Sequence, residues 1–165
     1  MLDNGNVGIG TSHTAPSQKL EVQGNILTTQ EDNPVARDYA SVSYPQGLHV
    51  SGKYAYVISN GNNLLAIYDI SNPDSIVTKA NTGVGLTNPF FVYVSGKYAY
   101  VPSPDNNRLC IFDISNPNSI VTKGYTNIGL SSPQGVYVSG KYAYVTSTNN
   151  SRLAIFDISN PDSII

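Results

Sequence analysis

The sequence lacks tryptophan and contains one methionine, one cysteine and two histidines among its 165 residues. Because Cys110 has no second cysteine to pair with, cysteine usage gives no indication of the compartment. Charged residues make up 12% of the chain, roughly half the ~25% typical of a soluble domain. There is no Lys/Arg cluster of a nucleic-acid binder and no apolar run near the ~20 residues that span a membrane. We therefore expect neither a nucleic-acid partner nor membrane insertion.

Motifs that carry chemistry are also missing. Gly5, Gly8 and Gly10 do not have the spacing of a dinucleotide fingerprint, and the Ser-Gly-Lys at residues 51–53 lacks the remainder of a phosphate-binding loop. The two histidines, His13 and His49, have no pattern of partners for zinc or for a catalytic triad. The sequence therefore predicts no enzyme activity, no cofactor and no metal site.

What the sequence does contain is an internal repeat. Pro45, Pro89 and Pro133 are spaced by 44 residues, and glycines, aspartates and further prolines recur at the same spacing. The copies run over residues 41–84, 85–128 and 129–165 without an insertion. Such a repeat indicates one supersecondary unit used three times.

Each copy predicts four strands joined by tight turns. In the first copy we expect strands at 48–50, 54–57, 65–70 and 76–79. Gly52 supplies the backbone angles of the first turn, and Ser-Asn-Pro at 71–73 supplies the third. The second and third strands are apolar on both faces, as strands buried on both faces are. Four such strands in about 44 residues favour an all-β fold, a β-propeller of three four-stranded blades, with a β-solenoid as the alternative.

The third strands of the three copies resemble the repeat of the LVIVD-repeat family; they are Leu65–Ile70, Leu109–Ile114 and Leu153–Ile158. The Tyr-Ala-Tyr-Val before each strand and the Ser-Asn-Pro after it strengthen the resemblance. The resemblance covers residues 45–165. It implies a bacterial, often surface-associated propeller with no assigned chemistry and with more than three blades. Three blades are fewer than the 4–8 that usually close a propeller, so the sequence predicts a fragment whose outer blade faces are apolar.

The residues before the repeats differ from them. Residues 4–27, with Gly8-Ile9-Gly10-Thr11, resemble a motif of phage tail fibres and bacterial surface fibres, which implies a small N-terminal β segment over 1–28 and a homo-oligomer formed through it. Residues 29–40 are interpreted as a polar linker, or alternatively as an outer strand of the first blade. The first residues of the sequence lack the basic and apolar stretches of a signal peptide, so we expect none in this chain. The two resemblances together imply an extracellular, cell-surface or virion location.

Variation between the copies identifies a candidate binding face. The loops between the second and third strands differ between copies, and so do the loops that lead into each blade, whereas the other two turns are constant. In an up-and-down blade both variable classes lie at the same end, where loops carry recognition. The candidate residues for an unknown protein or glycan ligand are Asn60, Asn62, Phe90, Phe91, Asp105, Asn106, Gln134 and Asn149.

The repeated aspartates Asp69, Asp113 and Asp157 have two interpretations, a ring of carboxylates that binds a cation or a set of strand-end acceptors for backbone N–H groups. Their occurrence once in each blade favours the second. The sequence thus predicts a non-catalytic binding or scaffold module of a bacterial cell-surface or phage-fibre protein. The alternatives are an enzyme whose catalytic residues lie in further blades and a purely structural spacer.

Overall fold

A computed structural model describes residues 36–164 of the chain. The chain divides into two units between Val35 and Ala36, and the three sheets found within the described residues belong to the second unit. The predicted fibre-like segment 1–28 and most of the predicted linker 29–40 lie outside the described residues.

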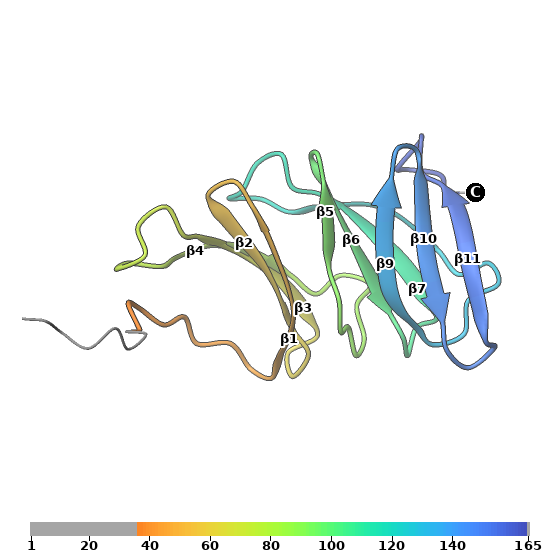
Figure 1. The fold of residues 1–165 in the computed structure, drawn as a ribbon, viewed down its shortest axis with the longest axis horizontal. Helices are drawn as coiled ribbons and strands as arrows, with labels where there is room; N and C mark the ends of the chain where they lie inside the picture. The colour runs from red at the N-terminus through yellow and green to blue at the C-terminus, as the bar shows by residue number, and fades with distance from the viewer. Residues whose placement is uncertain (1–35, 165) are drawn as a thin grey trace, which may run out of the picture. The chain divides into compact units, whose positions relative to one another are not determined.

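Three antiparallel sheets succeed one another in chain order (Figure 1). The first, blade 1, consists of β1 (Pro45–Ser51), β2 (Tyr54–Ser59), β3 (Leu64–Asp69) and β4 (Val77–Thr82). Blade 2 consists of β5 (Tyr93–Ser95), β6 (Tyr98–Ser103), β7 (Arg108–Asp113) and β8 (Val121–Thr126). Blade 3 has β9 (Pro133–Ser139), β10 (Tyr142–Ser147) and β11 (Arg152–Asp157), with β11 at its edge. Each strand pairs with its neighbour in sequence, which confirms the predicted all-β, blade-like fold.

The first strand of each blade differs from its prediction. β1 and β9 are seven residues long, extend back to Pro45 and Pro133, and contain a bulge, whereas β5 has three residues. Pro102 of blade 2 stands where blade 1 has Ile58 and blade 3 has Thr146. Proline has no N–H to donate to a neighbouring strand. The short β5 therefore coincides with a missing donor on the strand that it would pair with.

The fourth strands continue beyond their predicted ends. The expected strand at 76–79 is observed as β4, Val77–Thr82, and its copy as β8, Val121–Thr126. Both carry a bulge opposite the third strand, between Ile67 and Tyr68 in blade 1. Pairing with β3 and β7 extends these strands through residues that have little strand preference of their own.

The core lies between the sheets. Leu65, Ala66, Ile67 and Tyr68 of β3 are all buried, and so are the corresponding four residues of β7. One apolar cluster joins blades 1 and 2, and a second joins blades 2 and 3. Burial of both strand faces is what the weak polar alternation predicted. Within the described residues, no helix is present that is long and apolar enough to cross a membrane.

Candidate recognition face

The two classes of variable loop lie together at one end of the blades. In blade 1 the backbone N–H of Asn60, in the loop between β2 and β3, donates to the carbonyl of Tyr44 in the loop that leads into the blade, at 3.0 Å. The same bond joins Thr148 to Ser132 in blade 3, at 3.1 Å. In blade 2, Ser103 at the end of β6 bonds instead to Thr87 in the lead-in loop, so in each blade the two loop classes lie at the same end.

A buried serine fixes the lead-in loop of each blade. Ser103 Oγ accepts the N–H of Thr87 at 2.7 Å and donates to the carbonyl of the same residue at 3.0 Å. Ser147 makes the equivalent pair of bonds to Ser131 at 2.7 and 3.0 Å. In blade 1 only the bond from Ser59 Oγ to the carbonyl of Ser43 is formed, at 2.7 Å. All three serines are at most 2% exposed, so the hydrogen bonds that hold the lead-in loops are buried.

Left-handed asparagines connect each blade to the next. Asn63 and Asn107 end the turns between the second and third strands with φ of 55° and 53°, a conformation that asparagine tolerates better than most residues. Asn63 Oδ1 accepts the N–H of Asn88 at 2.6 Å, and Asn107 Oδ1 accepts the N–H of Ser132 at 2.8 Å. The third copy has Ser151 there, at φ 51°.

Asn88 joins two of the predicted residues. Its Oδ1 accepts from Asn60 Nδ2 at 2.7 Å, and its own Nδ2 donates to Asp105 Oδ1 at 3.2 Å. Asn60 Nδ2 also lies 3.0 Å from the carbonyl of Pro89. The side chains of Asn60 and Asp105 are therefore both engaged in a bridge between the loops of blades 1 and 2.

The remaining predicted residues divide by exposure. Asn106 is tied down, since its Nδ2 donates to the carbonyl of Gly85 at 3.1 Å. Phe90 is half-buried, and Phe91 keeps 40% of its surface exposed. The exposed polar members are Asn62, Gln134 and Asn149.

Gly47 shows how closely the inner strands approach at this end. A Cβ atom at Gly47 would lie 2.6 Å from the Phe90 carbonyl oxygen and 2.8 Å from Phe91 Cα. The backbone at Phe90 and Phe91 thus packs against blade 1, while the Phe91 ring remains accessible. This contact explains glycine at position 47.

Three aromatic residues at equivalent positions line the innermost strands. The ring centroids of His49 on β1 and Tyr93 on β5 are 5.1 Å apart, and those of Tyr93 and Tyr137 on β9 are 4.9 Å apart. Burial lowers the pKa of His49, because a partly buried site disfavours the charged imidazolium. A hydrogen bond with Tyr137 raises the pKa of Tyr93. The three rings pack against one another between the blades and place their polar atoms there.

The opposite end of the blades is constant in structure as well as in sequence. The N–H groups of Ile70, Ile114 and Ile158 each donate to the carbonyl of the turn lysine of their own blade at 2.9 Å. Each turn begins with a glycine at φ 57°: Gly52, Gly96 and Gly140. A side chain bond and a backbone bond from Ser159 lower the pKa of Asp157 to about 2. Asp69 and Asp113 accept the N–H of Ser71 and Ser115 at 3.0 and 2.9 Å, which confirms that the repeated aspartates accept backbone bonds at strand ends.

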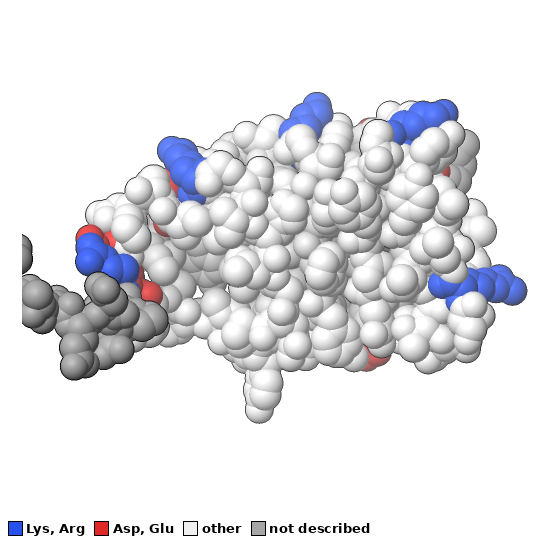
Figure 2. Space-filling view, in the orientation of Figure 1, with Lys and Arg blue, Asp and Glu red and all other residues white. Residues whose placement is uncertain are grey.

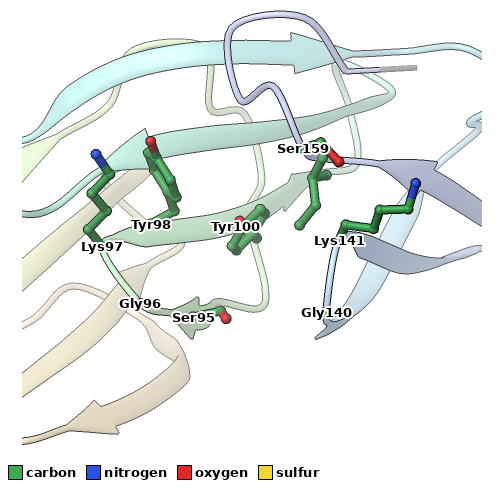
Figure 3. A pocket seen from close by; sticks show the side chains of 9 residues that line it. Ser95, Gly96, Lys97, Tyr98, Tyr100, Gly140, Lys141 and Ser159 are labelled. Carbon is green, nitrogen blue, oxygen red and sulfur yellow. The ribbon is translucent and has the colours of Figure 1, made fainter.

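A hollow of about 420 Å³ lies at this constant end between blades 2 and 3 (Figure 3). Lys97 and Lys141 from two equivalent turns flank it, and Tyr98, Tyr100 and Ser159 contribute to its lining. Lys141 is paired with Asp157 at 3.0 Å and lies 5.0 Å from the Tyr142 ring centroid. The turn residues Gly96, Lys97, Gly140 and Lys141 that line the hollow belong to the constant class.

Charge is sparse on the face shown in Figure 2, where most of the surface carries neither Lys/Arg nor Asp/Glu. Within residues 36–164 no group of three or more His, Cys, Asp or Glu side chains is arranged to hold a metal ion. Burial raises the pKa of the Cys110 thiol to about 12, so the thiol stays protonated and unreactive at neutral pH.

Residues 44–82, 91–127 and 132–165 each match the LVIVD repeat, and together they make up more than half of the sequence. The chain belongs to the LVIVD repeat family. No curated protein matches its sequence. The family match leaves residues 1–43 aside, so the fibre-like resemblance of residues 4–27 stays a prediction.

Solved structures similar to this LVIVD-repeat chain share its fold at low identity. A functionally unknown protein from Desulfotomaculum acetoxidans aligns with TM-score 0.65 at 18% identity, over 73% of this chain and 40% of that one. The periplasmic gluconolactonase of Pseudomonas aeruginosa aligns with TM-score 0.64 at 16% identity, over 73% and 37%. Hydrazine synthase of Kuenenia stuttgartiensis aligns with TM-score 0.63 at 16% identity, over 84% and 38%. The chain thus spans 40% or less of each structure's length, and the likeness shows a β-propeller fold.

Sequence reasoning missed the residues that hold the face of these LVIVD repeats in place. The serines at 59, 103 and 147 recur at the repeat spacing, and this recurrence was the available signal. Asn88 and Asn107 gave a weaker signal, since asparagine before a strand also occurs in ordinary turns. Their role depends on bonds to residues 25 positions away in sequence, which no local pattern reveals.

Proposed function

We propose that this LVIVD-repeat chain is a non-catalytic binding or scaffold module of a bacterial cell-surface or phage-fibre protein, and that it recognises a protein or glycan through the variable loop face. One observation carries the proposal. The loops of this face are fixed by the same side chains in successive blades, whereas their exposed tips differ. Fixed loops with differing tips are the arrangement of recognition loops on a rigid scaffold.

The exposed tips have the chemistry for recognition. Asn62, Gln134 and Asn149 offer amide donors and acceptors to solvent. Phe91 adds an accessible aromatic ring beside them on blade 2, and aromatic residues dominate the energetics of many interfaces. Amide groups beside one exposed ring suit a polar ligand with an apolar patch, such as a sugar ring or a peptide with an apolar side chain.

In three described groups, Asp113, Tyr100 and His49, the pKa is shifted away from neutrality. A general acid or base works best with a pKa near the working pH. Here, bonds from Ser115 hold the pKa of Asp113 below its usual range, and burial raises the pKa of Tyr100 to about 12. Burial also lowers the pKa of His49 and leaves the ring on the inner strand with tyrosine as its aromatic neighbour.

Binding to an array of immobilised glycans and to bacterial surface preparations tests the proposal, with Asn149→Ala and Phe91→Ser as the variants. The matched control is Asn118→Ala, which removes an exposed amide at the constant end. We expect each loop variant to weaken binding at least tenfold, the control to bind like the wild type, and far-ultraviolet circular dichroism to be unchanged.

Two results would contradict the proposal. One is binding that Asn118→Ala weakens and the loop variants do not, because the ligand would then occupy the constant end. The other is hydrolysis of glucono-lactone by the chain above the spontaneous rate, measured by base uptake at constant pH. That result would show catalysis by residues of this chain itself, a function that the likeness to a gluconolactonase raises at the level of fold alone.

A further inference from the structure

The hollow at the constant end lies between two blades that are packed on one another, and its floor is buried. Its volume is about 420 Å³, and all of its lining residues belong to blades 2 and 3. Tyr100 of β6 and Ile158, which follows β11, are 3% and 7% exposed and belong to the same apolar cluster. A concave site of this volume lies within the ~300–1,000 Å³ of small-molecule sites.

Two ammonium groups flank the hollow. Lys97 belongs to the turn between β5 and β6, and Lys141 belongs to the turn between β9 and β10. Figure 3 shows the two side chains on opposite sides of the hollow, with Tyr100 and Ser159 between them. The hollow therefore lies between two positive charges, which is the arrangement that attracts a ligand with a negative charge.

The aspartates of the same blades leave donors of both lysines available. Lys141 pairs with Asp157 at 3.0 Å, and an ammonium group has three donors. Within residues 36–164 Lys97 forms no ion pair. Asp113 and Asp157 do not line the hollow, but their charges offset those of the two lysines. A small inorganic anion is therefore held weakly, and a ligand needs contacts beyond its charge.

Hydroxyl groups and aromatic rings supply such contacts. Ser95, Tyr98 and Ser159 line the hollow together with the buried Tyr100. Ser159 Oγ donates to Asp157 Oδ1, and a hydroxyl oxygen that donates can still accept a bond. Burial raises the pKa of Tyr100 to about 12, so its hydroxyl stays protonated near neutral pH. Hydroxyl groups and tyrosine rings, which combine an apolar body with a polar tip, suit the hydroxyls and the C–H face of a sugar.

The repeat provides the same chemistry at the neighbouring junction. Each of the nine lining residues is matched by the same residue type 44 positions earlier in the sequence, between blades 1 and 2. There Lys53 and Lys97 take the places of Lys97 and Lys141. Equivalent lysines thus recur once in each blade at the constant end, and a glycan with an acidic group on successive units has a matching repeat.

We propose that the hollow binds a negatively charged sugar unit of an acidic glycan, with Lys97 and Lys141 bonding the anionic group and the tyrosines contacting the ring. Lysine is a point charge that does not select the geometry of one anion, so a carboxylate, phosphate or sulfate on the sugar serves equally. The formal net charge of -2 argues against a nucleic acid as the polymer. The site lies at the opposite end from the variable loops and does not depend on the function proposed for them.

Titration of the isotope-labelled chain with D-glucuronate, followed by nuclear magnetic resonance, tests the site residue by residue. D-Glucose is the matched neutral sugar. We expect the amide signals of Gly96, Gly140 and Ser159 to shift and to saturate with glucuronate. Glucose should bind about tenfold more weakly, because it lacks the charge-assisted hydrogen bonds to the lysines.

Two lysine variants test the contacts. Lys97→Met and Lys141→Met remove the charge and keep a long apolar side chain at an exposed position. We expect each to weaken glucuronate binding about tenfold, with an unchanged circular dichroism spectrum. The control is Lys79→Met, which removes the same charge from β4, outside the hollow. Phe91→Ser should bind glucuronate like the wild type, so failure at the variable loops and failure at the hollow are distinguishable.

Four results overturn the proposal. The first is the absence of saturable shifts with glucuronate, and the second is shifts confined to the variable loops. The third is inorganic phosphate that saturates the same amides with the affinity of glucuronate, because the hollow would then bind charge alone. The fourth is an oligonucleotide that binds there more tightly than an oligogalacturonate of the same charge.

Discussion

Replacing Ser103 with alanine tests whether the buried serines hold the variable loops. The hydroxyl is 0% exposed and serves both backbone groups of Thr87, one as acceptor and one as donor. Its removal leaves the Thr87 N–H without an acceptor, at about 1–3 kcal/mol, and takes one bond from the carbonyl, at about 1 kcal/mol. We expect Ser103→Ala to lower the free energy of unfolding by about 2–4 kcal/mol.

The equivalent serines of the three blades allow the expected losses of unfolding free energy to be compared within one protein. Ser147→Ala removes the same two bonds and should cost the same. Ser59→Ala removes a single bond to the carbonyl of Ser43, which still accepts the N–H of Gly61 at 3.3 Å, and should cost about 1 kcal/mol. Ser119→Ala, an exposed serine of the constant end, should stay within about 0.5 kcal/mol of the wild type.

Urea unfolding monitored by circular dichroism measures all four variants. With a slope of about 1–3 kcal/mol per molar urea, a loss near 3 kcal/mol lowers the midpoint by roughly 1–3 M at constant slope. The reasoning fails if Ser103→Ala lies within about 0.5 kcal/mol of the wild type, the range of an ordinary surface substitution, or if Ser59→Ala costs as much as Ser103→Ala.

Three further predictions concern single groups. The pKa of Asp157 is lowered to about 2 by its bonds with Ser159 and Lys141, below the ~3.9 of an unfolded chain. The stability that the carboxylate contributes is therefore present above about pH 4 and is lost as the pH falls toward about 2. In urea titrations, Asp157→Asn should make the free energy of unfolding less dependent on pH between those values. Because burial raises the pKa of Cys110 to about 12, a thiol reagent at mildly alkaline pH should label the chain only in denaturant, and labelling of the native chain at the rate of free cysteine would contradict this. Asn107→Gly should cost less than Asn107→Ala by about 1 kcal/mol, and Ser151→Gly should stabilise blade 3, since glycine takes the left-handed conformation at both sites without strain; equal melting of the two Asn107 variants would remove the strain argument.

The strands at the centre of each blade could be predicted because their burial is set by the blade interface itself. A strand covered on both faces carries apolar residues without alternation, and β3 and β7 do so. The boundaries of the first and fourth strands depend on their neighbours. β5 is short opposite Pro102, and β4 extends past Lys79 because β3 offers it a ladder. These strand boundaries depend on pairing between segments, which the sequence of one segment alone does not reveal.

The end of the blades that carries variation could also be predicted, because it is set by up-and-down connectivity. The role of each amide could not. Asn60 and Asn106 were expected to contact a ligand, and the structure gives them bonds within and between the loops. An asparagine in a turn can serve the backbone or solvent, and the choice depends on whether a carbonyl from another segment lies within about 3 Å.

In this chain, the contacts that stabilise the blades are made by other residues than those proposed to bind a ligand. In a repeat protein each unit depends on its own contacts and on those with its neighbours, and here these contacts lie in the buried serines, the left-handed asparagines and the blade faces. The tips of the variable loops take no part in them, so their substitution should leave stability within about 0.5 kcal/mol. Phe91 is the informative case, since this residue is 40% exposed where Gly47 and Gly135 stand in the other blades. A partly exposed aromatic side chain offers more contact energy to a ligand than any amide around it. The first measurement of binding should therefore be made on the Phe91 variant.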